Sequence, residues 1–305
     1  MALKHNLRAF RRTLGYILLK SIFWGIYFIP FNWLKAFARI LAKSGYFLFS
    51  KHRKLAMRSL DIAFEDKINI QEKKKIVQDS FRYMLEGAFE LLYCGRHLKY
   101  VKRLVRVRGI ENLNNALAKK RGVIAVTAHF GNFPVMQFKL ACEGYEINSI
   151  IRRMRDPLAN KFFLKKRNEW GVKTIYKEPR TACVSSSIKS LKNNEILFIL
   201  LDQNFGTGGV FVNFFNRKAA TATGPVILAQ RTNAVILPMF IVHDHTGKHV
   251  LLIDKEVELT NTADKQETIQ TNTQRLTDII ESYIRKYPAE WSWIHRRWKT
   301  QPEKV

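Results

Sequence analysis

Several features that are rare or absent limit what this 305-residue sequence can be. It contains only 3 cysteines, widely spaced and without a CxxC pair, so neither a disulfide framework nor a zinc site is indicated, and a reducing, cytoplasmic setting fits best. It has no internal repeat, no low-complexity run and no linker rich in proline or glycine, which favours one large domain over a repeat array. Because 47% of its residues are hydrophobic, the chain belongs with folded proteins.

Acidic residues are also scarce. The sequence has 25 Asp and Glu against 52 Lys and Arg, a formal net charge of +27. A charge of this size indicates an anionic partner: nucleic acid, anionic lipid headgroups or an acidic carrier protein. No nucleic-acid-binding module is recognisable, so we expect no nucleic acid and favour a membrane surface or a carrier protein.

One apolar stretch near the amino terminus approaches the length of a bilayer core. It runs from Leu14 to Leu34, is interrupted by Lys20 and is weakened at its far end by Pro30. It can span the membrane or lie in the interface, with its aromatic side chains near the headgroups, and a buried helix of a soluble protein is the alternative. We interpret residues 1–50 as a helical membrane-anchoring region and residues 51–305 as the catalytic domain.

The rest of the sequence alternates between helical and strand patterns. Residues 68–100 show helical spacing, and short apolar runs suited to buried strands follow at 105–109, 122–128, 147–151, 172–176, 196–201, 235–242 and 250–254. Helical segments separate most of them, at 113–119, 134–142, 158–170, 183–192, 224–231 and 266–286. This rhythm predicts an α/β fold with a mixed, mostly parallel central sheet flanked by helices.

The most informative segment places a histidine where a strand gives way to a helix. The apolar run ending at Ala128 is followed by His129, then by Gly131 for a tight turn, Asn132 as a helix cap and Pro134 in the first helical turn. Open α/β sheets bind their ligands at the carboxyl ends of strands, so His129 is a candidate catalytic residue. A lone histidine in such a position is as often an ordinary hydrogen-bonding residue.

Several segments together resemble one enzyme family. The stretch from His129 to Pro134 is similar to an HFGNWE-type signature, and the chain shares further segments with the same family: Gly109–Leu113, Arg152 to Pro157, Asp202-Gln203, Val212 to Pro225, and Trp291 to Lys299 in the pattern WxWxHRRWK. On these motifs the chain is identified as a member of the lipid A biosynthesis branch, the late lauroyl and myristoyl acyltransferases, of the lysophospholipid acyltransferase superfamily. The match covers nearly the whole chain.

The resemblance implies an activity and its partners. Such enzymes acylate hydroxyl groups of a lipid A precursor with acyl carrier protein as the usual donor, so an acyl thioester is the expected co-substrate and no cofactor or metal is expected. Their setting is the bacterial inner membrane, at its cytoplasmic face. Coenzyme A as the thiol carrier is left open.

The resemblance and the residue chemistry also assign roles. His129 is expected to be the general base, with Arg152 and the backbone N–H groups after His129 as donors to the tetrahedral oxyanion. Gly131 and Asn132 are expected to help bind substrate. Asp202, expected to be catalytic, and Gln203 at another strand end would shape the same crevice; a helix cap or turn is the alternative for Asp202.

Basic residues near the carboxyl end suit phosphate groups. Arg296 and Arg297 could bind phosphates of a lipid A-like acceptor or an acidic carrier protein, because a guanidinium makes bidentate contacts with such oxygens. A structural or solvated terminal segment is an equal alternative.

One position departs from the family pattern. The residue five positions after the family's histidine is Glu or Asp, which orients the imidazole, and here it is Pro134. Another carboxylate such as Asp202 or Asp156 can approach His129, the base can work without an orienting acid at reduced rate, or catalysis has been lost. The last case would leave a lipid-binding or scaffold protein.

A second group of histidines invites a metal interpretation. His243, His245 and His249 are close in sequence, but Asp244 to Gly247 read better as a hairpin turn between two apolar strands. The spacing matches no strong zinc pattern, so we expect no metal here.

Overall fold

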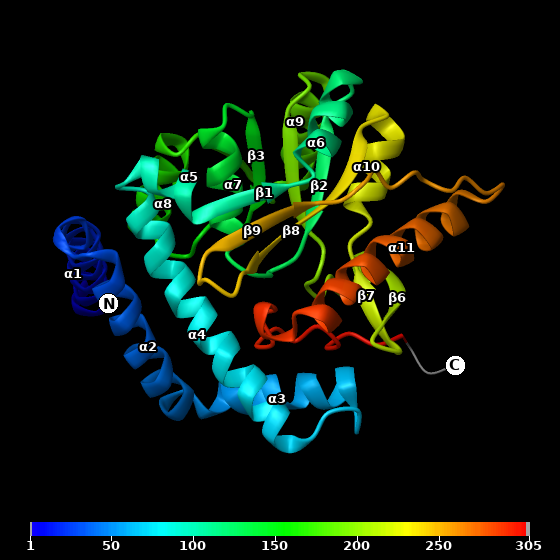
Figure 1. Ribbon diagram of the computed structural model, residues 1–305. Helices are drawn as coiled ribbons and strands as arrows, with labels where there is room; N and C mark the ends of the chain where they lie inside the picture. Colours follow the sequence, from blue (N-terminus) through cyan, green and yellow to red (C-terminus); the bar gives the residue numbers. More distant parts are fainter. Residues whose placement is uncertain (1, 303–305) are drawn as a thin grey trace.

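A seven-stranded sheet forms the centre of the protein (Figure 1). The computed structural model describes residues 2–302 and side chains at position 10 and from 12 to 302; residues 1 and 303–305, at the outer ends of the two expected regions, lie outside it. The strand order is β1-β9-β8-β2-β5-β3-β4. The strands are β1 Val105–Arg108, β2 Val123–Thr127, β3 Ile147–Ile151, β4 Val172–Tyr176, β5 Ile196–Leu200, β8 Val235–His243 and β9 His249–Ile253.

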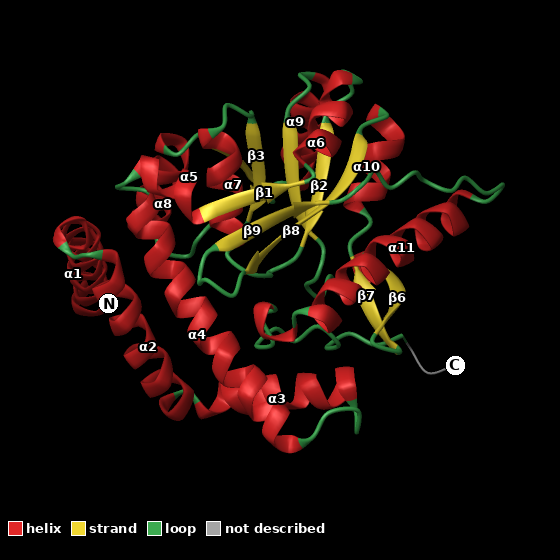
Figure 2. Cartoon of the chain, viewed as in Figure 1, coloured by secondary structure: helices red, strands yellow, loops and turns green. Residues whose placement is uncertain are grey.

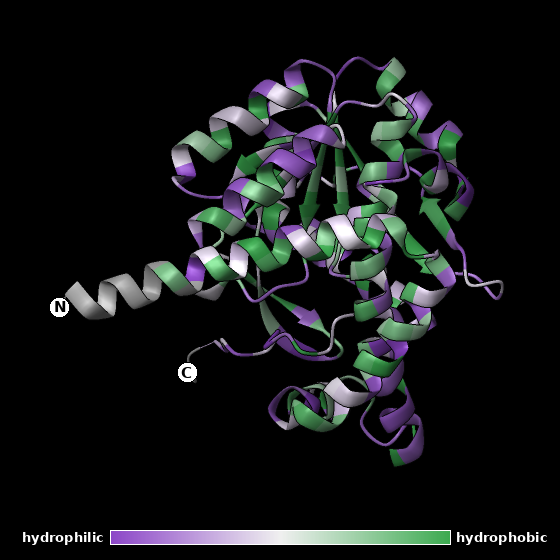
Figure 3. Ribbon diagram, turned by 90° about the vertical axis from the view of Figure 1, so that its left-hand side faces the viewer, coloured by the Kyte–Doolittle hydropathy of each residue, from purple (hydrophilic) through white to green (hydrophobic). Residues whose placement is uncertain are grey.

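All neighbouring strands run parallel except β8 and β9, which form an antiparallel hairpin. Residues of β2 and the first eight of β8 are all buried, as continuous apolar runs of a two-sided parallel sheet require. The predicted mixed, mostly parallel sheet is therefore confirmed, and the strands appear mainly in the hydrophobic colour of Figure 3.

Helices cover both faces of the sheet, as Figure 2 shows. Alternate residues of β2 belong to two separate apolar clusters: Ile124 and Val126 pack with side chains from α3, α4 and α9 to α11, whereas Val123 and Ala125 pack with side chains from α5 to α8. The helices are α3 Ser50–Phe64, α4 Ile70–Cys94, α5 Leu98–Leu104, α6 Ile110–Ala118, α7 Phe133–Cys142, α8 Pro157–Glu169, α9 Arg180–Lys192, α10 Gly224–Thr232 and α11 Lys265–Lys286.

A small second sheet was not predicted from the sequence. Strands β6 Val210–Phe214 and β7 Arg217–Thr221 form a hairpin whose two turn residues, Phe215 and Asn216, both have positive φ, as a two-residue hairpin turn demands. The hairpin is joined to α11, where Gln274 donates to the carbonyl of Asn213 at 2.9 Å and accepts from its N–H at 2.7 Å. Side-chain contacts with a distant helix therefore help to hold this segment in strand form.

The amino-terminal apolar stretch is broken into separate helices. Helix α1 spans Ala2–Gly25, a 3-10 turn follows at Ile26–Phe28, and α2 spans Phe31–Leu48. Pro30 stands at the start of α2, where its missing N–H costs no helical hydrogen bond. The expected continuous segment from Leu14 to Leu34 is thus interrupted, and none of the helices in the described chain combines the length and apolarity needed to cross a membrane. The domain division at residue 50 stays a prediction.

Candidate active site

Three neighbouring parallel strands carry the expected site residues to one edge of the sheet. Strands β2, β5 and β3 lie side by side, and the chain continues from their carboxyl ends into His129, Asp202 and Arg152. The N–H of Leu201 donates to the carbonyl of Thr127 at 3.0 Å, so β2 and β5 leave the sheet at the same level. This register is what brings His129 opposite Asp202, although 73 residues separate them.

Asp202 holds the ring and backbone of His129. The Nδ1 atom of His129 lies 2.9 Å from Oδ1 of Asp202, and the His129 backbone N–H donates to Oδ2 at 2.9 Å. The indole Nε1 of Trp291 donates to the same Oδ2 at 2.8 Å. Asp202 is the carboxylate that orients the histidine, the role that Pro134 cannot fill. Asp156, the other carboxylate considered, instead caps α8 by accepting from Ala159 N–H at 2.9 Å.

The same contacts keep Asp202 ionised. Its side chain is fully buried, and burial raises a carboxyl pKa; the charge and hydrogen bond of His129, the charge of His295 and the Trp291 hydrogen bond outweigh this and bring the pKa of Asp202 well below its usual range. A permanent carboxylate at Nδ1 fixes the ring proton there and stabilises a positive charge on the ring.

The opposite nitrogen of the ring has one polar neighbour, and the side chain is partly exposed. The His129 side chain is 26% exposed, and the Nε2 atom lies 3.1 Å from the Nε2 amide nitrogen of Gln203. Because Nδ1 donates to Asp202, the His129 Nε2 lone pair accepts from this amide.

The carboxyl-terminal segment at residues 291–295 also contacts His129 and Asp202, and the sequence analysis predicted no role for it there. Besides Trp291, it contributes His295, whose ring centre lies 4.7 Å from that of His129. Burial, together with the charge of His129, lowers the pKa of His295, which favours its neutral form. Ser292 also donates its N–H to the His129 carbonyl at 3.1 Å. The WxWxHRRWK motif was the available signal, but its first tryptophan and its histidine were not assigned roles.

The turn after His129 is structural, which corrects one expectation. The N–H of Phe130 donates to the Ala128 carbonyl at 2.7 Å, and that of Gly131 donates to the Glu290 carbonyl at 2.8 Å. These two groups are therefore not free to bind an oxyanion. Gly131 has φ +54°, and a Cβ atom there would lie 2.0 Å from the Ile241 carbonyl oxygen, so only glycine fits.

We expect Gly131→Ala to destabilise the protein by several kcal/mol, because the added carbon requires the turn to move away from β8. Thermal unfolding followed by circular dichroism measures this, with Gly144→Ala as the control: Gly144 also has positive φ, but its Cβ would meet nothing within 4 Å. Equal stability losses for the two variants would contradict the role of the Ile241 contact.

Asn132 also differs from its expected role. It stands before α7, but its side chain does not cap that helix. It is buried and donates from Nδ2 to the Gly87 carbonyl at 3.0 Å and to Glu90 Oε2 at 3.1 Å, both in α4. Asn132 therefore anchors the turn to α4, and its amide is not available to a substrate.

The two adjacent arginines have opposite environments. Arg297 is fully buried and donates to the carbonyls of Gln203 and Ala220, at 3.3 and 2.7 Å, and to Thr221 Oγ1 at 2.5 Å. Burial lowers its pKa to about 10. The expectation that Arg297 binds substrate phosphates is therefore wrong: its guanidinium instead holds the backbone at Gln203 and at Ala220. Arg296 is exposed, as is Arg152, and no described residue pairs with the Arg152 guanidinium.

Together, the fold and the site define an α/β protein with a paired histidine and aspartate at the carboxyl edge of its sheet. The model of the family described as bacterial lipid A biosynthesis acyltransferase matches residues 3–300. The chain belongs to this family and is an O-acyltransferase.

Two relatives from Escherichia coli agree with this assignment. The chain is 26% identical over 294 residues to the lipid A biosynthesis lauroyltransferase of Escherichia coli, covering 93% of this chain and 91% of that protein. It is 27% identical over 276 residues to the lipid A biosynthesis palmitoleoyltransferase of the same organism, covering 83% and 81%. A solved structure, the 1-acyl-sn-glycerophosphate acyltransferase of Thermotoga maritima, aligns with TM-score 0.39 and 17% identity over 84% of this chain and 97% of that one.

Proposed function

We propose that this enzyme transfers a fatty acyl group from an acyl thioester, carried by acyl carrier protein, to a hydroxyl of a lipid A precursor or a related membrane lipid. The observation that carries the proposal is the pairing of His129 Nδ1 with the buried carboxylate of Asp202, which leaves Nε2 as a base at an exposed edge. Family membership supplies the lipid and the acyl chemistry.

The proposed mechanism needs no covalent enzyme intermediate. His129 Nε2 removes the proton of the acceptor hydroxyl as its oxygen attacks the thioester carbonyl. The imidazolium, stabilised by Asp202, then protonates the sulfur as the carbon–sulfur bond breaks. The products are the ester and the free thiol, so protons and acyl groups balance.

The oxyanion of the tetrahedral intermediate requires donors. Since the N–H groups of Phe130 and Gly131 are already bonded, we assign this role to the Arg152 guanidinium and the Gln203 amide. Both follow strands adjacent in the sheet, and both are exposed.

The charge of the chain supports an anionic donor and acceptor. Acyl carrier protein is acidic, and lipid A precursors carry phosphates, whereas the chain has a formal net charge of +27. Exposed Arg296 is assigned to these phosphates. The charge suits an acidic carrier protein, and coenzyme A, whose phosphates are also anionic, is the alternative donor.

The amino-terminal helices support binding at the inner-membrane surface. Sixteen of the twenty large hydrophobic side chains that are exposed in the described chain lie between residues 10 and 49, and the other four are scattered at Ile70, Met84, Leu98 and Met154. In α2, Leu34, Ala38 and Ala42 are buried, whereas Trp33 and Phe37 are exposed. An apolar outer face of this kind, beside Lys and Arg, fits an interfacial helix on anionic lipid.

We expect the double variant Trp33→Ser, Phe37→Ser to bind vesicles of mixed neutral and anionic phospholipid at least about 10-fold more weakly, because each large apolar side chain contributes roughly 1.5–3 kcal/mol when buried. Vesicle sedimentation measures the partition. Leu98→Ser, at an exposed position outside these helices, is the control. If the double variant and the control bind alike, these helices do not contact the membrane.

The activity itself is tested with the purified protein, radiolabelled lauroyl and palmitoleoyl thioesters of acyl carrier protein, and a lipid A precursor in detergent. We expect an acylated lipid product, formed more slowly when lauroyl-coenzyme A replaces the carrier-protein thioester. Saturable binding of the precursor without product would instead support the lipid-binding alternative raised by Pro134.

A further inference from the structure

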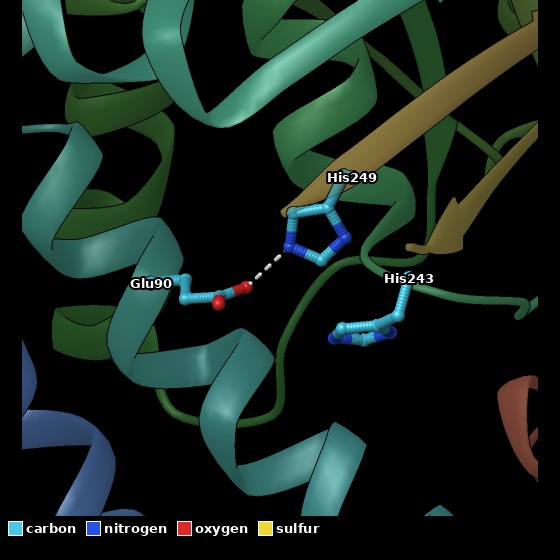
Figure 4. Close-up of side chains that lie close together, drawn as sticks. All are labelled: Glu90, His243 and His249. Carbon is cyan, nitrogen blue, oxygen red and sulfur yellow. Dashed lines mark hydrogen bonds and ion pairs between the residues drawn. The ribbon is translucent and has the colours of Figure 1, made fainter. Parts of the chain in front are cut away.

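A buried group of titratable side chains, shown in Figure 4, lies beside the turn at residues 130–132. Glu90 of α4 and His249 of β9 have fully buried side chains, and Oε2 of Glu90 lies 2.7 Å from Nε2 of His249. The ring of His243, at the end of β8, lies 4.4 Å from that of His249, centre to centre. Sequence reasoning placed the two histidines at a hairpin, and the fold adds Glu90, 159 residues away from His249.

The bonds already made identify this group as an ion-pair network. Nδ1 of His243 lies 2.9 and 3.0 Å from the two carboxylate oxygens of Glu290, and Nζ of Lys35 lies 3.4 Å from Oε1 of Glu90. Two histidines and a glutamate are also a donor set for zinc, and Nε2 of His243 is buried without a partner. Lys35 already supplies a cation to Glu90, so the network needs no metal ion for its charge.

This network holds the turn that follows His129 from two sides. On one side, Asn132 Nδ2 donates to Glu90 Oε2 at 3.1 Å and to the Gly87 carbonyl at 3.0 Å. On the other side, the Gly131 N–H donates to the carbonyl of Glu290, in the 3-10 turn Pro288–Glu290. The turn is therefore clamped between α4 and the carboxyl-terminal segment.

A carboxylate suits the position of Glu90, because every neighbouring polar group there donates a hydrogen bond or carries a positive charge. It receives hydrogen bonds from Asn132 and His249, and an ammonium group approaches its other oxygen. Burial raises the pKa of Glu90, but the hydrogen bond and charge of His249 and the charges of His243 and Lys35 lower it to about 2. A glutamine has the same shape, but its N–H₂ must face either the Lys35 ammonium or the Asn132 amide. The ammonium attracts the amide oxygen, so the N–H₂ faces Asn132 and the bond that holds the turn is lost.

We propose that Glu90 is a positioning residue for the reaction: through Asn132 it fixes the turn at residues 130–132 and so aims Nε2 of His129 at the acceptor hydroxyl. The proposal rests on the function proposed for His129. It makes α4 a part of the site, although no sequence motif at Glu90 indicates such a role. Lys35 extends the same network to α2, and its Nζ also donates to the carbonyl of Gly247, in the turn between β8 and β9, at 3.0 Å.

The test compares Glu90→Gln and Asn132→Ala with Glu86→Gln. Glu86 is a matched control: it lies one turn earlier in α4, its side chain is 4% exposed and it bonds Arg39 at 2.7 Å, but it does not contact the turn. We expect kcat, per folded molecule well below the melting temperature, to fall about 10- to 100-fold in Glu90→Gln and Asn132→Ala, as misplacement of a reacting group implies. The KM for the acceptor should change little, and Glu86→Gln should retain its kcat.

Two further measurements separate positioning from simple damage. The double variant Glu90→Gln, Asn132→Ala should be no slower than the slower single variant, because both act through one bond. In ¹⁵N spectra, His129 should carry its proton on Nδ1 in all three proteins, because Asp202 is unchanged. The chemical shift of Nε2 should differ from that of the wild type in Glu90→Gln, where the ring is displaced, and match it in Glu86→Gln. This readout does not need turnover, so it tests Glu90 even if the wild type transfers no acyl group, the result that would refute the proposed function alone.

Equal kcat and equal His129 spectra for Glu90→Gln and Glu86→Gln would overturn the proposal. So would one equivalent of zinc in the purified wild type that is lost in His249→Ala, since the buried group would then be a metal site.

Discussion

His129→Ala is expected to lower kcat for acyl transfer by about 10²- to 10⁴-fold, the range over which a positioned general base accelerates a reaction. Alanine leaves Asp202 and Gln203 in place but provides no group that takes the hydroxyl proton. The KM for the thioester should change little, because donor binding does not require the imidazole. Initial rates with purified enzyme, thioester and lipid acceptor measure both constants.

A matched histidine variant shows whether this loss is specific. His245 is exposed at the tip of the β8–β9 hairpin, and His245→Ala should keep wild-type kcat. If His129→Ala retained a rate within about threefold of the wild type, its imidazole could not be the general base.

Asp202→Asn is expected to reduce kcat by a comparable factor, about 10³- to 10⁴-fold, because the equivalent change in a serine-protease triad fixes the wrong histidine tautomer. The asparagine oxygen can still accept from the His129 N–H and Trp291 Nε1, so its NH₂ faces Nδ1. The ring must then carry its proton on Nε2, the nitrogen that has to act as base. Steady-state rates and the ¹⁵N shifts of His129 report the two effects separately.

Two further variants complete this comparison. Asp156→Asn, at the cap of α8, should leave kcat within about twofold, since asparagine also caps helices. Pro134→Glu should not restore activity to Asp202→Asn, because Nδ1 is approached from β5 and not from α7. Rescue by Pro134→Glu would show that the helix, and not Asp202, is the natural source of the orienting acid.

The depressed pKa of Asp202 also has a consequence for stability. A carboxyl whose folded-state pKa lies below its unfolded value of about 3.9 stabilises the fold above that pH, and this contribution is lost as the pH falls through the folded pKa. Asp202 therefore stays charged across the neutral range, and protonation of Asp202 does not limit activity there.

Local sequence determined the elements of the sheet. Continuous apolar runs such as those ending at Thr127 and Leu200 are typical of two-sided parallel strands, and each of the seven predicted strands is present within one or two residues. His129 was placed at a strand end by the same reasoning. The β6–β7 hairpin and the end of α1 before Pro30 were not predicted. The hairpin is held by side chains of α11, and packing decides whether an apolar run that contains a proline forms one helix or two.

The sequence by itself determined the strand pattern, the basic charge, the family motifs and the residue that can act as base, since each depends on residue type and spacing along the chain. Only the tertiary structure decided which carboxylate pairs with His129, that Asn132 and Arg297 are buried and hydrogen-bonded within the protein, and that Glu90 contacts Asn132 in the turn after His129. The physical reason is the range of the contacts: hydrogen bonds span about 3 Å, and the partners lie 73, 42 and 77 residues apart in the chain, so only strand order and helix packing bring them together.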